Sequence, residues 1–348
     1  MTRIKETLYR DIAAGKFQET GKLPGVRELA ERFNCSRGTV ANALKLLAND
    51  GIVRLEHGRG TFVEEVKRPP VTKNNRVIGA VLLWYSWMEE MEKVRAKYLK
   101  DDWLISLYCS SKDLQNPQEE RHFLELAREQ NFSGVILTGS PIEPLNTNLY
   151  YSLRKSGMKI LHLTNYKEDM TQEAAILPDY RMAGALAAST AALQGKKKIV
   201  TVSSTPFAAP STKLRNAGAI SMAKALNLEI LPELLIHTEQ WVTTISSENM
   251  KKFLDNCGPL EDVALLVNGC AMLNEVQIWM AKNGIPKAEQ PFALSMTDTH
   301  PLSKELNHIS FNYAQSIKLA MDYMTNESID PLEPYTVYLD PILKLVSK

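Results

Sequence analysis

The first seventy residues contain three helical patterns followed by an apolar hairpin, and few folds accommodate that order. Apolar residues recur at the spacing of one helix face in three segments. They are Ile4, Leu8 and Ile12; Val26, Leu29, Ala30 and Phe33; and Val40, Ala43, Leu44 and Leu47. Two short apolar runs, 52–55 and 61–63, then flank a glycine-containing tip at 56–60. Helices joined by a tight turn and followed by such a hairpin predict a winged helix-turn-helix over residues 1–66.

The third helix must present its polar side to solvent, because its apolar residues face the core. Ser36 precedes this helix, and its hydroxyl can accept a hydrogen bond from a first-turn N–H group. Arg37 is the candidate for reading bases, since a guanidinium can bridge O6 and N7 of guanine. Ser36 and Thr39 are placed for phosphate contacts. Asn42 could read adenine, and Gly38 would let the helix start lie close to the DNA backbone.

Further polar groups flank this face. Arg27, at the start of the second helix, is placed to contact a phosphate, and His57, Gly58 and Arg59 would lie over the adjoining groove. Residues 1–68 carry 13 Lys and Arg against 9 Asp and Glu, whereas the remainder is net negative. The positive excess therefore coincides with the segment predicted to meet phosphates. The alternative is a small helical domain with ordinary surface charges.

Three runs in this segment carry a more specific likeness: GKLPGVRELA at 21–30, SRGTV at 36–40 and GRGTFV at 58–63. They resemble the gluconate-repressor (GntR) family of bacterial transcription factors. The resemblance implies that three features contact DNA: the arginine of the first run, the start of the recognition helix and the glycines of the wing tip. Those roles fall on Arg27, on Ser36, Arg37 and Thr39, and on Gly58 and Gly60. Where the family usually has a further arginine, this chain has Ala41, so its operator sequence is expected to differ.

A chain of 348 residues is too long for one such module and suggests two or three folding units. Residues 67–76 combine prolines, cations and asparagines, which predicts a linker. The cysteines lack the spacing of a zinc site, so free thiols and no metal are expected; they are Cys35, Cys109, Cys257 and Cys270. No apolar run is long enough to cross a membrane. The opening residues lead directly into an amphipathic helix, and we expect a cytoplasmic protein without a cofactor.

Beyond residue 76, short apolar runs alternate with helical patterns. Strands are expected at 77–83, 104–109, 135–138, 160–163, 175–177, 199–203, 263–267 and 292–296. Helices are expected between them, for example at 118–130, 181–193, 214–226 and 273–283. Buried strands each followed by a helix imply parallel sheets covered on both faces. The length predicts an α/β domain of two doubly wound lobes over 77–348, with a ligand cleft between them at the carboxyl ends of the strands.

Four passages of this segment, at 132–137, 179–199, 213–218 and 283–286, carry a second likeness. They resemble the lactose-repressor (LacI) family and the sugar-binding proteins of type I periplasmic fold. The resemblance implies a two-lobed effector domain that binds a small molecule, with a sugar as the family expectation. We also expect a homodimer formed through the large domain, because paired modules that read two half-sites multiply specificity.

Six positions match the family's ligand contacts. Arg215 would donate to ligand hydroxyls, Trp241 would stack on a sugar face, and Asn268 and Asp298 would accept hydroxyl protons. In the first lobe, Tyr85 in the loop 84–87 and Ser140 would complete the pocket. Each has a plainer interpretation: a core or interface aromatic for Trp241, a helix-terminal charge for Arg215 and a turn cap for Asp298. Relatives often carry an Asn-Asp pair where this chain has Asn268-Gly269, and the missing carboxylate argues for a non-standard ligand.

These observations favour a transcriptional regulator, a repressor in the family pattern, that binds double-stranded operator DNA and responds to a small molecule. One alternative is a sugar-binding protein of the transport type, which would have no use for a DNA-binding module. The other is an enzyme-fused regulator, since some relatives of the first module are fused to aminotransferase-like domains. Neither a glycine-rich phosphate loop between a strand and a helix nor a Ser/His/Asp constellation is evident, so no enzymatic activity is expected.

Overall fold

The computed structural model describes residues 2–13, 16–17, 21–49, 51–64, 75–82, 85–108, 117–138, 146–205, 209–239, 242–298 and 301–346. The chain divides into two compact units. The first comprises Met1–Asn74, Leu145–Ile160 and Asp330–Leu332, and the second comprises the remaining residues. Most of the expected linker, 67–74, lies outside the described residues, and the domain boundaries inferred above stay a prediction.

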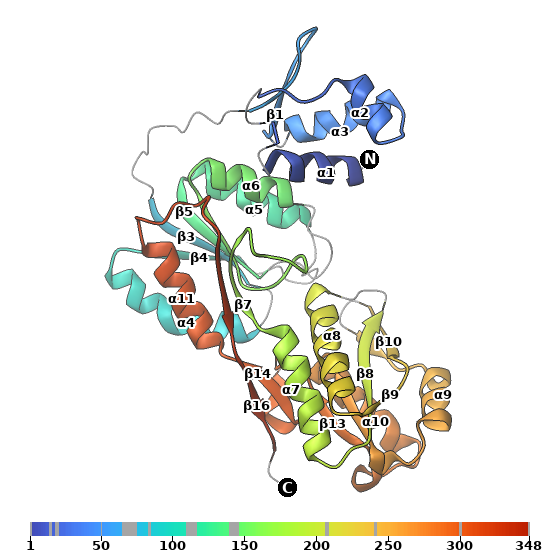
Figure 1. The fold of residues 1–348 in the computed structure, drawn as a ribbon. Coiled ribbons are helices and arrows are strands. Elements are labelled where there is room, and N and C mark those ends of the chain that lie inside the picture. The colour runs from blue at the N-terminus through green and yellow to red at the C-terminus, as the bar shows by residue number, and fades with distance from the viewer. Residues whose placement is uncertain are drawn as a thin grey trace. The chain divides into compact units, whose positions relative to one another are not determined.

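The amino-terminal part of the first unit has the expected order of elements (Figure 1). They are α1 (Thr2–Ala13), α2 (Val26–Arg32), α3 (Arg37–Asn49), β1 (Val53–Glu56) and β2 (Gly60–Val63). The strands pair antiparallel from Val53 opposite Val63 to Glu56 opposite Gly60. The apolar faces named above form one core, in which Leu8, Leu29 and Leu47 are fully buried. The winged helix-turn-helix prediction is confirmed.

A six-stranded sheet forms the first lobe, in the order β15-β7-β6-β5-β3-β4. Its strands are β3 (Asn75–Val81), β4 (Leu104–Tyr108), β5 (Phe132–Leu137), β6 (Lys159–His162), β7 (Ala174–Pro178) and β15 (Tyr335–Leu339). β3 pairs in parallel with β4 and β5, and β7 pairs in parallel with β6 and β15. The helices of this part of the chain are α4 (Tyr85–Lys100), α5 (Pro117–Glu129), α6 (Thr147–Lys155) and α11 (Tyr313–Thr325).

An eight-stranded sheet forms the second lobe, in the order β11-β10-β8-β12-β13-β14-β16, with β9 paired to β8. Its strands are β8 (Lys198–Thr205), β9 (Glu229–Ile230), β10 (Leu234–Glu239), β11 (Val242–Thr244), β12 (Val263–Val267), β13 (Phe292–Ser295), β14 (His308–Phe311) and β16 (Pro341–Lys344). Its helices are α7 (Tyr180–Leu193), α8 (Pro210–Ala225), α9 (Ser247–Cys257) and α10 (Cys270–Lys282). Short 3₁₀ turns occupy Leu260–Asp262, Lys287–Glu289 and Pro301–Glu305.

Strand β12 illustrates why the central strands of these sheets are apolar along their whole length. Ala264 and Leu266 pack into the core cluster that continues into the first lobe, whereas Val263, Leu265 and Val267 pack against the opposite cluster with α9 and α10. A parallel strand covered on both faces has no solvent side, so polar residues do not alternate with apolar ones. The two-lobed α/β prediction is confirmed.

The chain passes between the sheets three times: after β7, after β14, and between β15 and β16. The first passage enters α7, which the side chain of Asp179 caps by accepting from the Met182 amide at 2.8 Å. The residues that begin α7 and α11 therefore lie where the two lobes join, which places Tyr180 and Tyr313 at that junction.

Candidate DNA-binding surface and effector site

The start of α3 is capped as the sequence predicts. The Thr39 amide donates to Ser36 Oγ at 3.1 Å, and the two hydroxyl oxygens of these residues lie 2.8 Å apart. The cap satisfies one of the amide donors that a helix N-terminus leaves open. It also holds two hydroxyl groups at the end of the helix where the backbone N–H groups converge. Such an end suits a phosphate oxygen.

The opposite faces of α3 divide cleanly between core and solvent. Val40, Ala43, Leu44 and Leu47 are buried, whereas Thr39 is half-buried and Arg37, Gly38, Asn42 and Lys45 are exposed. Arg37 therefore extends from the first turn of a helix whose apolar face is fully engaged elsewhere. This arrangement presents a long cationic donor at the helix end, and the DNA contacts themselves stay a prediction.

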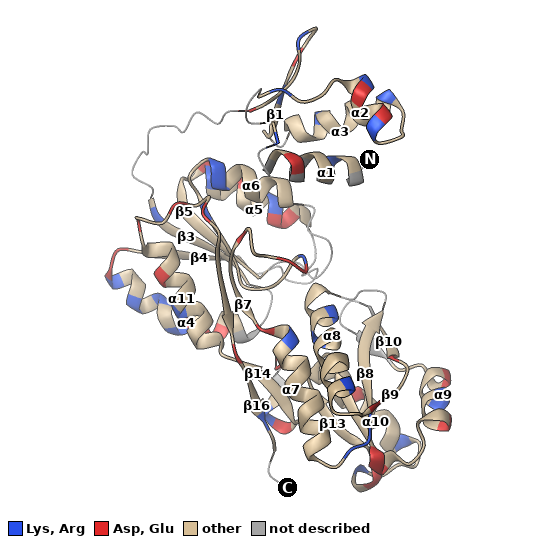
Figure 2. Ribbon diagram, in the orientation of Figure 1, with Lys and Arg blue, Asp and Glu red and all other residues tan. Residues whose placement is uncertain are grey.

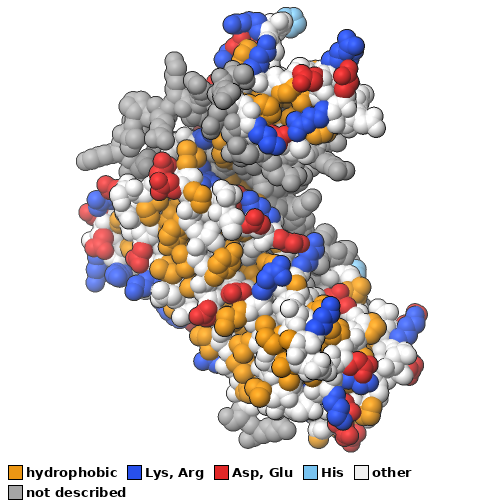
Figure 3. Space-filling model, viewed as in Figure 1, with side chains coloured by type: hydrophobic (Ala, Val, Ile, Leu, Met, Phe, Trp, Pro, Cys, Tyr) orange, Lys and Arg blue, Asp and Glu red, His pale blue; other side chains and the backbone are white. Residues whose placement is uncertain are grey.

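The hairpin tip needs glycine for two different reasons. Gly58 has a φ of +74°, in the left-handed region that favours glycine. Gly60 has a φ of +123°, and a Cβ there would lie 2.8 Å from Cε of Lys22. Lys22 belongs to a short extended segment that pairs with Phe62, so the wing gains a third pairing segment that the sequence did not suggest. The predicted wing residues His57 to Gly60 are all exposed. Figure 3 shows cationic side chains on the surface of the amino-terminal module.

Arg27 lies in the first turn of α2 and is exposed, with Nε 3.4 Å from Oε1 of Glu31. An exposed ion pair of this kind contributes little stability, because water screens both charges. Arg27 can therefore exchange Glu31 for a phosphate at low cost. In Figure 2, where the ribbon is coloured by residue type, basic and acidic residues are interspersed on α2 and on the hairpin.

In the second lobe, two of the predicted effector contacts meet directly. Arg215, on α8, is 6% exposed, and its Nε donates to Oδ1 of Asn268 at 2.8 Å. Its Nη2 donates to Oγ1 of Thr212 at 3.2 Å, and the guanidinium carbon lies 5.2 Å from the centre of the Tyr180 ring. The guanidinium is thus fixed on one face by an aromatic ring and along one edge by neutral acceptors.

Asn268 follows β12 at its carboxyl end and organises a polar cluster. Its Nδ2 donates to Oδ1 of Asn216 at 2.8 Å and lies 3.1 Å from Oγ of Ser203. Asn216 in turn donates to Glu233 at 2.7 Å. These side chains come from three different parts of the lobe, and they bring α8, β8 and β12 to one point at the carboxyl ends of the strands, the usual ligand edge of such sheets.

Asp298 follows β13, and its carboxylate accepts hydrogen bonds from two hydroxyl groups. The Tyr313 hydroxyl donates to Oδ1 at 2.5 Å and the Ser310 hydroxyl donates to Oδ2 at 2.6 Å. Burial raises the pKa of Asp298, although these two hydrogen bonds oppose the rise. Burial also raises the pKa of Tyr313 well above its usual value, so its proton stays in place as the donor.

Three predicted first-lobe or loop contacts are not placed. Ser140 and Trp241 lie outside the described residues, and so does the side chain of Tyr85. The expected loop at 84–87 is wrong from Tyr85 onward, because α4 begins there. Trp87 lies in the first turn of α4 and is 1% exposed, with its ring edge-on to Tyr313 at 4.7 Å and its Nε1 donating to Ser316 at 3.3 Å.

Tyr180 and Tyr313 are contacts of this region that sequence reasoning missed. Each is the first residue of a helix that follows a passage between the lobes, and each is buried beside Phe311. Burial raises the pKa of Tyr180 to about 12, opposed by the charge of Arg215. One sequence signal could have pointed to these two tyrosines. In each case a helix-capping residue, Asp179 or Asn312, directly precedes the aromatic residue.

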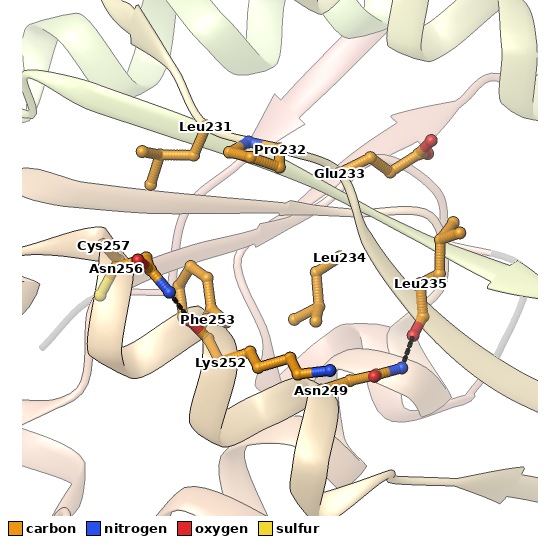
Figure 4. A pocket seen from close by; sticks show the side chains of 10 residues that line it. All are labelled: Leu231, Pro232, Glu233, Leu234, Leu235, Asn249, Lys252, Phe253, Asn256 and Cys257. Atoms are coloured by element: carbon orange, nitrogen blue, oxygen red, sulfur yellow. Dashed lines mark hydrogen bonds between the residues drawn. The ribbon is translucent and has the colours of Figure 1, made fainter.

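A separate pocket of about 480 Å³ lies in the second lobe between the segment leading into β10 and the face of α9 (Figure 4). Leu231, Leu234 and Phe253 supply its apolar wall, and Glu233 and Lys252 its charged groups. None of the predicted effector residues lines it. Glu233 nevertheless connects it to the polar cluster through the hydrogen bond from Asn216.

Within the described ranges, no three His, Cys, Asp or Glu side chains gather as metal ligands. The same portion of the chain contains no helix long and apolar enough to span a membrane. Of the cysteines, Cys35, Cys257 and Cys270 are free thiols, whereas Cys109 lies among the undescribed residues.

Comparison with known proteins gives matches to both the amino-terminal module and the two-lobed part of the chain. Residues 1–63 match the family model of the bacterial regulatory proteins, gntR family. The amino-terminal segment therefore carries a gntR-type helix-turn-helix domain. Over 175 residues the chain is 26% identical to the arabinose metabolism transcriptional repressor of Halalkalibacterium halodurans. That match covers 48% of this chain and 46% of the relative, so the chain spans about half the length of the curated relative it matches.

Solved structures match the larger part of the chain. The cellobiose complex of the transcriptional regulator CelR aligns with a TM-score of 0.61 and 13% identity, over 93% of this chain and 99% of that one. A LacI transcriptional regulator from Lactobacillus brevis aligns with a TM-score of 0.58 and 14% identity, over 77% of this chain and 100% of that one. At these identities the likeness is one of fold, and it confirms the LacI-type, two-lobed architecture.

Proposed function

We propose that this chain is a bacterial transcription regulator whose winged helix binds operator DNA and whose two-lobed part binds a small sugar-like effector. The observation that carries the proposal is Arg37, exposed in the first turn of a helix that Ser36 caps and whose other face is buried. The match of residues 1–63 to the gntR family model supports the DNA-binding role. The relative that represses arabinose metabolism favours a repressor of sugar metabolism.

Each residue of the DNA-binding surface has a distinct role in this proposal. Arg37 and Asn42 read base edges in the major groove, where a bidentate contact discriminates bases by roughly 1–3 kcal/mol. Phosphates are held by Arg27 and by the hydroxyl groups of Ser36 and Thr39. The wing, from His57 to Gly60, lies over the adjoining groove, and Gly38 allows close approach of the helix.

The effector contacts are proposed at the carboxyl ends of the second-lobe strands and across the cleft from them. Arg215, Asn268 and Asp298 supply donors and acceptors that are already oriented by neighbouring groups. Tyr85, Ser140 and Trp241 complete the site in this proposal. The complex of CelR with cellobiose supports a sugar-like ligand for this fold.

Effector binding and DNA binding are coupled through a homodimer in this proposal. Two winged helices on one dimer read two half-sites, which multiplies specificity. An effector shifts the dimer between two states only by its different affinity for them, and a hundredfold change in operator occupancy needs roughly 3 kcal/mol of coupling. A protein that binds chromosomal DNA in this way acts in the cytoplasm.

Substitution of Arg37 tests the DNA-binding assignment. Arg37→Ala removes the base-reading donor while leaving the helix cap and the buried face intact. We expect specific operator affinity in a gel-shift assay to fall at least tenfold, whereas circular dichroism stays unchanged. The matched control is Arg128→Ala, which removes an exposed arginine from α5 in the first lobe. Equal operator affinity of Arg37→Ala and Arg128→Ala would exclude Arg37 from the interface.

A further inference from the structure

Arg215 is a buried cation whose described partners are all neutral. The guanidinium donates to the side-chain oxygens of Asn268 and Thr212 and lies over the ring of Tyr180. Only 6% of the residue is exposed to solvent. Among the described residues, no carboxylate forms an ion pair with it. Burial lowers the pKa of Arg215, and the groups that oppose this fall are the hydroxyls of Tyr180 and Tyr313.

The carboxylates described in this region do not pair with Arg215. Glu233 accepts a hydrogen bond from Asn216. Position 269, where the lactose-repressor resemblance implies an aspartate, is Gly269. Asp298 accepts hydrogen bonds from Tyr313 and Ser310, and the positive group that acts on its pKa is His308. Within the described part of the chain, the desolvated positive charge of Arg215 therefore has no carboxylate in an ion pair with it. Proteins rarely bury a charged side chain in that way unless something else pairs with it.

The unused donors of Arg215 define the shape of the missing partner. A guanidinium has five N–H donors, and Asn268 and Thr212 together occupy two of its nitrogens. Tyr180 covers one face, and the remaining N–H donors point outward in the plane of the group. In-plane approach with two parallel N–H donors is the geometry that binds carboxylate and phosphate oxygens.

We infer that the effector of this site is an anion, a polyhydroxy compound bearing a phosphate or carboxylate that pairs with Arg215. The inference rests on the proposed function, since it names the ligand class of the same site. Asn268, Asn216 and Ser203 would hold the hydroxyl groups of such a ligand, because their amides and hydroxyl lie in one hydrogen-bonded cluster beside Arg215. The charged group of the ligand supplies the counter-ion that the described residues do not provide.

Thermal unfolding of the full chain tests this with inorganic phosphate as the probe, at constant ionic strength set with chloride. We expect phosphate to raise the melting temperature of the wild type by about 2 °C or more, because a ligand that binds only the folded state stabilises it. Arg215→Met should lose this rise. Lys224→Met, which removes an exposed cation from the last turn of the same helix, should retain it.

Two sugar probes separate this inference from the proposed function. D-glucuronate and D-glucose share the pyranose ring and differ at C6, where glucuronate carries a carboxylate, and we expect only glucuronate to raise the melting temperature in an Arg215-dependent manner. If glucose stabilises the wild type and neither glucuronate nor phosphate does so, the anionic class is wrong while an effector site for neutral sugars stands. If only Lys224→Met abolishes the phosphate response, phosphate binds elsewhere and the inference also fails.

Discussion

Asp11 shows how one residue ties the amino-terminal helices together. Its side chain is buried, and its two oxygens accept from Lys16 at 2.6 Å and from Arg32 of α2 at 2.7 Å. Burial by itself would raise the pKa of Asp11, but the hydrogen bonds and charges of Lys16 and Arg32 outweigh it and lower the pKa below its usual value. The ionised carboxylate therefore stabilises the packing of α1 against α2.

Replacing this carboxylate should loosen the DNA-binding module. We expect Asp11→Asn to destabilise it by about 1 kcal/mol, a modest value because Lys16 and Arg32 are partly exposed and water screens them. Hydrogen exchange of peptides from α1 and α2 in the full chain measures the loss. Glu31→Gln, which removes only an exposed ion pair with Arg27, is the control, and identical exchange in both variants would contradict the role of Asp11.

The pH dependence of this contribution follows from the direction of the shift. A carboxyl group whose pKa is lowered on folding adds stability above its unfolded value, about 3.9 for aspartate. The difference between wild type and Asp11→Asn should therefore be full near neutral pH. It should vanish as the pH falls through the lowered pKa of the folded protein. A difference that grows on acidification would contradict this assignment.

At the scale of elements, the contact of α7 with α8 sets the position of Arg215. A Cβ on Gly184 would lie 1.8 Å from the Arg215 carbonyl oxygen, and a Cβ on Gly218 would lie 2.0 Å from that of Arg181. The two backbones thus touch at a reciprocal pair of glycines, with no room for any side chain. This close crossing brings Arg215 over the Tyr180 ring, which lies in the first turn of α7.

Adding a methyl group at this crossing should be costly. We expect Gly218→Ala to destabilise the second lobe by about 1–3 kcal/mol, because backbone atoms must move apart to admit the Cβ. Differential scanning calorimetry of the full chain measures the change. Ser221→Ala, at an exposed position one turn further along α8, is the control and should have little effect. Equal melting temperatures of the two variants would contradict this prediction, because they would show that α7 and α8 can move apart to admit the Cβ at no cost.

For the whole molecule, the proposal requires two chains to act together. We expect sedimentation equilibrium to give twice the 39.1 kDa of one chain at the concentrations where operator DNA is bound. An operator with two half-sites should then bind about 100-fold or more tightly than a single half-site, because the second contact is intramolecular. A single-chain mass under these conditions, or equal affinity for the two DNAs, would contradict the dimer.

Much of this architecture was predictable because it rests on local periodicity. The buried faces of α1, α2 and α3, the cap at Ser36 and the glycines of the wing all follow from residues close together in the chain. The eight expected strands of the lobes lie within a few residues of their predicted positions. The expected loop at 84–87 was wrong from Tyr85 onward, because α4 begins there. The strands β9, β10, β11, β14, β15 and β16 were not expected from the sequence, because strands this short carry a weak pattern.

The general type of this chain follows from its residue pattern: a capped, cation-bearing helix in a winged module, followed by alternating α/β lobes. Those features depend on spacings of two to seven residues, which local sterics and burial dictate. The contacts between distant groups, by contrast, are visible only in the folded chain. Arg215 and Asn268 are 53 residues apart, and a pair of glycines brings the Arg215 backbone against α7 and its side chain over Tyr180. Whether a buried charge has a partner depends on such long-range contacts, which residue spacing does not encode.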